Sequence, residues 1–272
     1  MHEYPSLLRI RYDNISPAYG KRYFEEIGDY KDLFKQELVI TEKVDGSQMA
    51  IGWKNGQPYL QGKNSHIPEF DKRKAYYGAW SWAWANISKL EKLSGFLVYG
   101  EWARVQHSLP YDDLPDWFLA FDVYDLEKAR FLNWDKVVEF AKEVGLTTVP
   151  ELHRGKVRKD ELPFYVTNRK SRFSTSAILE ETRFDDGERA LIQKRDANGN
   201  AGRFKDGMVF CEGCVIKPLQ NPKFDQKKKT VYWTNCGKVI TQEFGDCFED
   251  DSHWTSERMR ENKLAAWYGV KK

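Results

Sequence analysis

The sequence has few cysteines and lacks both long apolar runs and a clear N-terminal signal. Four cysteines among 272 residues are too few for the disulfide framework of a small secreted protein. No segment approaches the roughly 18 apolar residues of a membrane-spanning helix. Residues 1–19 lack the apolar core of a signal peptide. We therefore expect a cytoplasmic, monomeric protein that does not enter a membrane.

The sequence also lacks a strong excess of charge of one sign. Lysine and arginine total 43 against 41 acidic residues, a net charge of +2, which argues against a surface that is basic throughout. A local basic run at Lys227–Lys229 fits either a solvated loop or a phosphate contact. Aromatic residues are abundant (10 Trp, 14 Tyr and 16 Phe), and they supply core volume or stack on nucleobases.

Short apolar segments bounded by turn residues dominate the chain. The Asn55-Gly56 pair between two apolar runs predicts a β-hairpin. We expect further strands at 38–40, 96–102, 117–124 and 211–217, with 230–234 and 238–241 as hairpin partners of the last. We also expect turns over 185–207 and helices over 72–93, 133–144 and near 257–267. This mixture predicts an α+β fold of twisted antiparallel sheets with flanking helices. We expect one main domain over residues 1–245 and a short helical appendage over 246–272.

A lysine stands at the end of the first of these strands, in the segment Thr41-Glu42-Lys43-Val44-Asp45-Gly46. A lysine in this position can face an open pocket, and a neutral amine can attack the α-phosphorus of a nucleotide. The glycine would let the backbone pass close to a ligand. The tetrapeptide Lys-x-Asp-Gly is common, however, and by itself favours a hairpin with a surface ion pair.

Three later strands carry charged and aromatic residues in a fixed order. Gly100-Glu101 lies in an apolar strand, Phe121-Asp122 ends an aromatic strand, and Glu212-Gly213-Cys214-Val215-Ile216-Lys217 joins a carboxylate to a lysine. Carboxylates bind metals or ribose hydroxyls, an aromatic ring stacks on a purine, and lysine offsets phosphate charge.

Together these ordered segments resemble the covalent nucleotidyltransferase superfamily of DNA ligases, RNA ligases and capping enzymes. The chain is most similar to phage and bacterial RNA ligases, and the resemblance covers roughly residues 38–254. It implies an adenylyltransferase domain over residues 1–245. It also implies an ATP-dependent RNA ligase that needs Mg²⁺ or Mn²⁺ and joins 5′-phosphate and 3′-hydroxyl ends of RNA, including nicked duplex or DNA-containing ends.

The resemblance assigns roles to single residues. Lys43 resembles the nucleophile that becomes adenylylated, and Glu212 resembles the carboxylate that positions the metal. Lys217 and Lys238 resemble the lysines that complete the catalytic set. The implied nucleotide-binding residues are Glu42, Asp45, Gly46, Lys63, Glu101, Phe121 and Glu212, with Phe118 as a rival to Phe121 for the ring that stacks on adenine.

The last motif departs from the family pattern. Two basic residues separated by one residue are usual, whereas Cys236-Gly237-Lys238 stands here and lacks the first of them. Lys238 is our choice for the remaining one, with Lys229 as the alternative. This departure leaves open a nucleic-acid-binding module with a degenerate ligase fold. DNA ligase and capping enzyme are further alternatives, although a capping enzyme usually needs another domain, and we expect no room for one after residue 245.

Two other readings compete for the same residues. Cys211 and Cys214 have the spacing of a zinc site, but the later Cys236, Cys247 and His253 are irregularly spaced, and buried thiols are the simpler interpretation. The Trp80, Trp82 and Trp84 side chains favour a core-facing helix over a base-stacking face.

Overall fold

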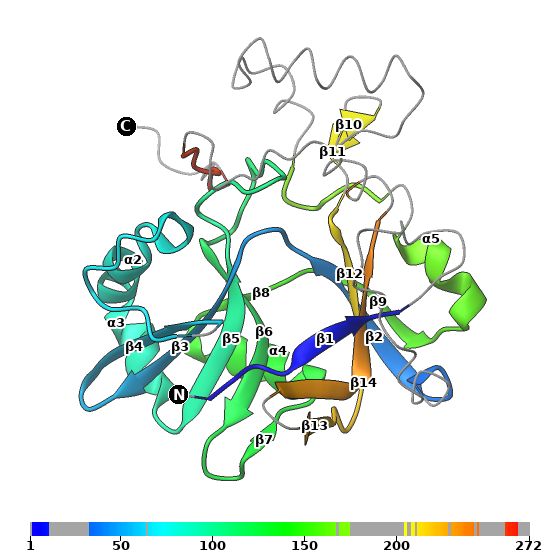
Figure 1. Cartoon of the computed structure of the whole chain (residues 1–272), viewed down its shortest axis with the longest axis horizontal. Coiled ribbons are helices and arrows are strands. Elements are labelled where there is room, and N and C mark those ends of the chain that lie inside the picture. Colours follow the sequence, from blue (N-terminus) through cyan, green and yellow to red (C-terminus); the bar gives the residue numbers. More distant parts are fainter. Residues whose placement is uncertain are drawn as a thin grey trace.

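The computed structural model describes residues 2–10, 33–63, 65–166, 169–174, 204–205, 208–209, 211–227, 230–241, 244 and 259–265. In this part of the chain, two six-stranded sheets carry short helices on their outer sides (Figure 1). The expected turns over 185–203 lie outside the described residues. No helix in the described ranges is long and apolar enough to cross a membrane.

The first sheet carries the lysine-bearing strand between β12 and the edge strand β9. Its strand order is β1-β14-β12-β2-β9, and β13 pairs with β14. Only β1 and β14 run parallel; the other pairs are antiparallel. The strands are β1 (Ser6–Arg9), β2 (Glu37–Lys43), β9 (Glu151–Lys156), β12 (Gly213–Pro218), β13 (Phe224–Lys227) and β14 (Thr230–Ile240). The predicted pairing of the 211–217 segment is confirmed for 238–241 but not for 230–234, because residues 230–233 pair with β13.

The second sheet is formed by the part of the chain between β2 and β9. Its order is β4-β3-β5-β6-β7, and β8 adds to β6 in parallel. Its strands are β3 (Ser47–Lys54), β4 (Gln57–Gly62), β5 (Phe96–Trp102), β6 (Phe118–Asp125), β7 (Arg130–Phe131) and β8 (Thr147–Thr148). The predicted hairpin joins β3 to β4, and both Asn55 (φ 54°) and Gly56 (φ 76°) have the positive φ that a type I′ turn requires. A separate two-stranded ribbon joins β10 (Phe204–Lys205) and β11 (Met208–Val209).

Helices cover the outer sides of both sheets. In Figure 1, α2 and α3 lie beside β3 and β4, and α5 lies on the opposite side of the molecule. The helices are α2 (Ala79–Ala85), α3 (Ile87–Leu90), α4 (Trp134–Val144) and α5 (Leu162–Val166), with 3₁₀ turns at Lys74–Tyr76, Glu91–Leu93 and Lys159–Glu161. The expected helix over 72–93 is therefore broken into short pieces, because Gly78 has a left-handed backbone and the chain turns at Asn86.

Helix α4 has the bounds that its end residues predict. The Asn133 side chain accepts a hydrogen bond from the backbone N–H of Lys136 at 3.0 Å, and Gly145 ends the helix with φ 81°. Trp134, Val137 and Ala141 form its buried face.

The expected helix near 257–267 is wrong over its described part. Residues 259–265 run as an extended segment that forms single bridges from Glu261 to Val105 and from Leu264 to Leu114. Asn262 is buried and accepts from the Tyr111 backbone N–H at 2.9 Å while donating to the Ala103 carbonyl at 2.8 Å. These long-range bonds hold the segment extended. The boundary at residue 245 stays a prediction.

The two sheets meet through an aromatic cluster. Tyr4 comes from the chain before β1, Tyr99 from β5, Phe131 from β7 and Trp233 from β14, and all four are buried. Ring centroids lie 4.6–5.8 Å apart for the pairs among them that are in contact. This packing sets the angle between the sheets and thereby the cavity between them.

Candidate active site

A cavity of about 460 Å³ opens where the two sheets meet. Eight of the ten residues that the sequence nominated line it: Glu42, Lys43, Gly46, Lys63, Glu101, Phe121, Lys217 and Lys238. They come from both sheets and from segments up to 196 positions apart in the chain. The cavity therefore brings together the motifs that were recognised separately.

Lys43 is the last residue of β2 and sits opposite Gly213 of β12. Its ammonium nitrogen lies 2.5 Å from Oε2 of Glu212, the residue before Gly213. Burial alone would lower the pKa of Lys43, but the negative charges of Glu212 and Glu101 outweigh burial and raise it. The amine is therefore protonated in this state. Glu212 reaches the site through this contact, although it is not among the residues lining the cavity.

Two further charged groups of the cavity have strongly shifted pKa values. Burial raises the pKa of Glu101 to about 8, and nearby Glu212 and Asp45 add to the effect while Lys43 opposes it. Burial lowers the pKa of Lys238 to about 8, assisted by repulsion from Lys43. Shifts of this size in a cavity are characteristic of functional sites.

Lys217 is held at the wall of the cavity by two hydrogen bonds. Its Nζ donates to Asp122 Oδ2 at 2.7 Å and to the Phe121 backbone carbonyl at 2.8 Å, and both charged side chains are almost completely buried. Asp122 also accepts a hydrogen bond from the Tyr4 hydroxyl at 2.5 Å. Asp122 thus links Lys217, which lines the cavity, to Tyr4 of the aromatic cluster.

Phe118 and Phe121 differ in whether their rings reach the cavity. Phe118 is fully buried in the core of the second sheet, whereas Phe121 is partly exposed and lines the cavity. Phe121 is the unpaired residue of a β-bulge in β6, so its ring departs from the regular alternation of the strand. Phe121 is therefore the ring available to a ligand.

Asp45 and Glu42 are engaged in bonds within the protein. Asp45 Oδ2 accepts from the backbone N–H groups of Ser108 and Leu109 at 2.7 and 2.8 Å, and Asp45 does not line the cavity. Glu42 lines the cavity, but its carboxylate accepts from the Ser171 hydroxyl at 2.5 Å and from the Arg172 backbone at 3.2 Å. Asp45 therefore anchors a loop here, and the expected nucleotide contacts of both residues stay predictions.

Gly46 allows a close approach, although to the protein itself. A Cβ at this position would lie 2.7 Å from the Trp102 carbonyl oxygen and 3.0 Å from Glu101 Cγ. The turn after Lys43 can therefore press against β5 only because residue 46 has no side chain.

The last motif places one cation in the cavity. Lys238 lies on β14 beside Val215 of β12 and lines the cavity, whereas Cys236 is buried in the aromatic cluster between the sheets. The position of the missing basic residue therefore carries no charge. The alternative Lys229 lies outside the described residues, as does the side chain of Lys227.

The zinc interpretation gains no support from the described residues. Cys211, Cys214 and Cys236 are buried free thiols, and within the described ranges no group of three His, Cys, Asp or Glu side chains could hold a metal ion. Cys247 and His253 lie outside those ranges.

Sequence reasoning missed one wall of the cavity. Tyr4, Ser6, Leu7 and Leu8, from β1 and the residues before it, line it, and Asp122 supports it from behind. No motif marks residues 4–8, because their place depends on pairing with β14, some 230 positions later.

Comparison with known proteins supports the expected family. The RNA ligase family matches residues 36–234 of this chain. No curated protein shows significant similarity to it.

Among solved structures, a mutant of Naegleria gruberi RNA ligase with ATP and Mn is similar over 91% of this chain and 62% of its own, with a TM-score of 0.50 and 17% identity. Another mutant of that ligase, with AMP and Mn, is 16% identical over 89% of this chain and 61% of its own, with a TM-score of 0.49. The chain thus spans about three fifths of the length of these proteins. The first of these likenesses agrees with the predicted α+β nucleotidyltransferase fold. Since the family match covers most of the sequence, the chain belongs to the RNA ligase family.

Proposed function

We propose that this protein is an ATP-dependent RNA ligase that joins 5′-phosphate and 3′-hydroxyl ends through an adenylylated Lys43. The observation that carries the proposal is that the Lys43 amine lies among acidic and basic side chains in one cavity. Glu212 lies 2.5 Å away, and Glu101, Lys63 and Lys238 line the same cavity. A surface lysine in a simple hairpin would have none of these neighbours.

In the first step, Nζ of Lys43 attacks the α-phosphorus of ATP, a nitrogen–phosphorus bond forms, and pyrophosphate leaves. Lys43 must lose its proton before it attacks. Because Glu212 and Glu101 raise its pKa, self-adenylylation should become faster as the pH rises. Lys238 and Lys63 are placed to offset phosphate charge, and Phe121 offers a ring face to the adenine.

The residues around Lys43 fit a divalent cation. Mg²⁺ prefers oxygen ligands and commonly binds through one or two carboxylates together with substrate phosphates, and Glu212 supplies a carboxylate 2.5 Å from the Lys43 amine. Glu212 is our choice for the residue that holds Mg²⁺ or Mn²⁺. The cation would supply positive charge against the phosphates during transfer.

In the later steps AMP moves from Lys43 to the 5′-phosphate of an RNA end, and the nitrogen–phosphorus bond breaks. The 3′-hydroxyl of a second end then attacks the activated phosphate, a phosphodiester forms, and AMP leaves. The protein contributes mainly position and charge to these transfers.

The first step can be tested directly. The protein should acquire label from ATP carrying ³²P at the α position in the presence of Mg²⁺ or Mn²⁺, and Lys43→Ala should not. Lys92→Ala, which alters an exposed lysine away from the cavity, serves as the matched control and should label like the original protein.

The same assay separates the alternatives. Absence of label over a range of pH and metals would overturn the ligase proposal and favour a binding module. Labelling by GTP in place of ATP would favour a capping enzyme. Supplying nicked duplexes, single-stranded RNA and DNA to the labelled protein then identifies the ends that it joins.

A further inference from the structure

A second hollow, of about 390 Å³, lies over the hairpin of β3 and β4 and beside helix α2. Four aromatic rings line it: Tyr59, His66, Trp80 and Trp84. We call this hollow the aromatic groove. It shares no lining residue with the cavity around Lys43, and none of its residues takes part in the steps proposed above.

The three tryptophans of α2 divide between two roles. Trp82 is buried and packs against Trp102 and Phe118, as the expectation of a core-facing helix requires. Trp80 and Trp84 instead face the aromatic groove, with ring centroids 6.1 Å apart. Trp84 is 42% exposed, which is unusual for so large an apolar side chain. Trp80 also packs partly against the core, so Trp84 is the ring that core packing explains least.

The indole N–H groups of Trp80 and Trp84 are bonded within the protein, so a ligand would meet these side chains through their rings. Trp80 Nε1 donates to the Ile67 carbonyl and Trp84 Nε1 donates to Glu69 Oε1, both at 3.0 Å. On the other wall Tyr59 and His66 lie with ring centroids 5.3 Å apart, and Lys54 Nζ lies 5.8 Å from the Tyr59 ring.

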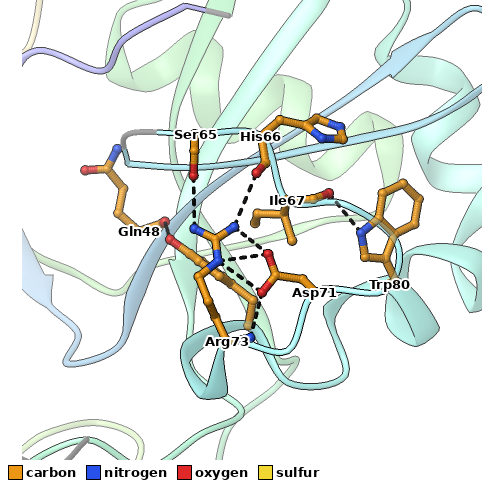
Figure 2. A network of polar contacts seen from close by, with 8 residues as sticks. Gln48, Ser65, His66, Ile67, Asp71, Arg73 and Trp80 are labelled. Atoms are coloured by element: carbon orange, nitrogen blue, oxygen red, sulfur yellow. Dashed lines mark hydrogen bonds and ion pairs between the residues drawn. The ribbon is translucent and has the colours of Figure 1, made fainter.

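A network of polar contacts holds the loop that forms the groove. Figure 2 shows the Arg73 guanidinium reaching three parts of the loop at once. It donates to both oxygens of Asp71, to the Ser65 hydroxyl at 3.0 Å and to the His66 carbonyl at 3.2 Å. These bonds order the loop that carries His66 before any ligand binds, which lowers the entropy cost of binding.

The aromatic groove and the Lys43 cavity share one segment of chain. Tyr59 lies in β4, and Lys63, which lines the cavity, follows directly after that strand. Four residues of strand span roughly 13 Å. Exposed Lys54 and Lys63 lie at the two ends of this path and can attract a phosphate backbone.

Rigid aromatic faces beside cationic side chains are the features by which proteins bind unpaired nucleobases. We propose that the aromatic groove binds bases of a single-stranded RNA segment next to the end that the Lys43 cavity acts on. This inference rests on the proposed ligase function for the identity of the ligand.

Binding of a fluorescently labelled single-stranded RNA with a 5′-phosphate, measured by anisotropy, tests the inference without requiring catalysis. Trp84→Ala and Tyr59→Ala should each weaken binding about 5- to 150-fold, the range that corresponds to the loss of one base–aromatic stack, and Trp84→Phe should restore most of it. Phe164→Ala is the matched control, since Phe164 is an 82% exposed aromatic on α5, across the molecule from α2 (Figure 1).

Labelling by ATP in the same variants separates this inference from the proposed function. Trp84→Ala should label at the rate of the original protein while its affinity for RNA falls. If the intact protein takes no label, the ligase proposal fails, and the RNA-binding comparison still decides the groove. Unchanged affinity in Trp84→Ala and Tyr59→Ala, relative to Phe164→Ala, overturns the inference.

A measurement on the unaltered protein guards against misfolded variants. Ultraviolet crosslinking to RNA that contains 5-iodouridine should join the RNA to Tyr59, His66, Trp80 or Trp84, as mapped by mass spectrometry. Crosslinks confined to other residues would also overturn the inference.

Discussion

Replacing Asp122 by asparagine removes the negative charge that holds the ammonium group of Lys217 against the wall of the cavity. The two groups lie 2.7 Å apart, and their side chains are only 3% and 5% exposed. Asparagine has nearly the same size as aspartate, so the change leaves the packing intact. Lys217 would then be a buried cation whose remaining hydrogen-bond partners are the Phe121 carbonyl and an uncharged amide, with the Phe121 and Trp134 rings nearby.

The cost can be worked from this burial. Breaking a buried ion pair by removing one charge costs about 3–5 kcal/mol, because the other charge is left without compensation in a poorly solvated place. The Phe121 carbonyl still accepts from Lys217, so we expect the lower end, about 3 kcal/mol. That is a large part of the roughly 5–15 kcal/mol by which a folded domain is stable.

The assay is urea unfolding followed by tryptophan fluorescence. The double variant Asp122→Asn/Lys217→Met removes both charges and keeps the volume. It should be more stable than Asp122→Asn alone by about 2 kcal/mol. Asp160→Asn breaks the exposed pair with Arg158, and it should leave the free energy of unfolding almost unchanged.

Two results would refute this reasoning. One is a cost for Asp122→Asn as small as that for Asp160→Asn. The other is a double variant whose loss of stability equals the sum of the losses in Asp122→Asn and in Lys217→Met measured alone. The effects of independent sites add, whereas those of a coupled pair do not.

Two further predictions concern the cavity and the sheet beneath it. Burial raises the pKa of Glu101 to about 8 from 4.5, so between these pH values the folded protein holds a proton that the unfolded chain has lost, and stability falls as the pH rises. The melting temperature of Glu101→Gln relative to that of the original protein should therefore increase as the pH is raised from 4.5 to 8. A difference in melting temperature that does not change with pH would contradict the assignment. At Gly213, an added Cβ would collide with the Val239 carbonyl oxygen of the neighbouring strand. Gly213→Ala should destabilise the protein by about 3 kcal/mol or more in urea unfolding, and Gly56→Ala, where the added Cβ meets no atom within 4 Å, is the comparison for a local backbone effect. Equal losses in the two variants would argue against the close strand contact.

Much of the local structure was predictable because its causes lie within a few residues. The Asn55-Gly56 turn and the ends of α4 follow from backbone preferences and capping side chains that act over one to four positions. The helix over 72–93 was mispredicted as one piece because apolar spacing does not reveal the left-handed backbone at Gly78. The extended path of 259–265 was missed because it depends on bonds between Asn262 and residues some 150 positions earlier.

The sequence by itself determined the order of the motifs and hence the residues that could carry the chemistry: Lys43, Glu101, Phe121, Glu212 and Lys238. A family's chemistry demands these residue types in this order, and the order can be read without knowing how the chain folds.

Only the tertiary structure decided how these residues are used. It turned Phe121 to the cavity and Phe118 to the core, bound Asp45 to a loop, and placed the β1 strand across the site. Each of these outcomes depends on contacts between segments distant in the chain, and such contacts follow from packing and charge pairing that no local pattern specifies.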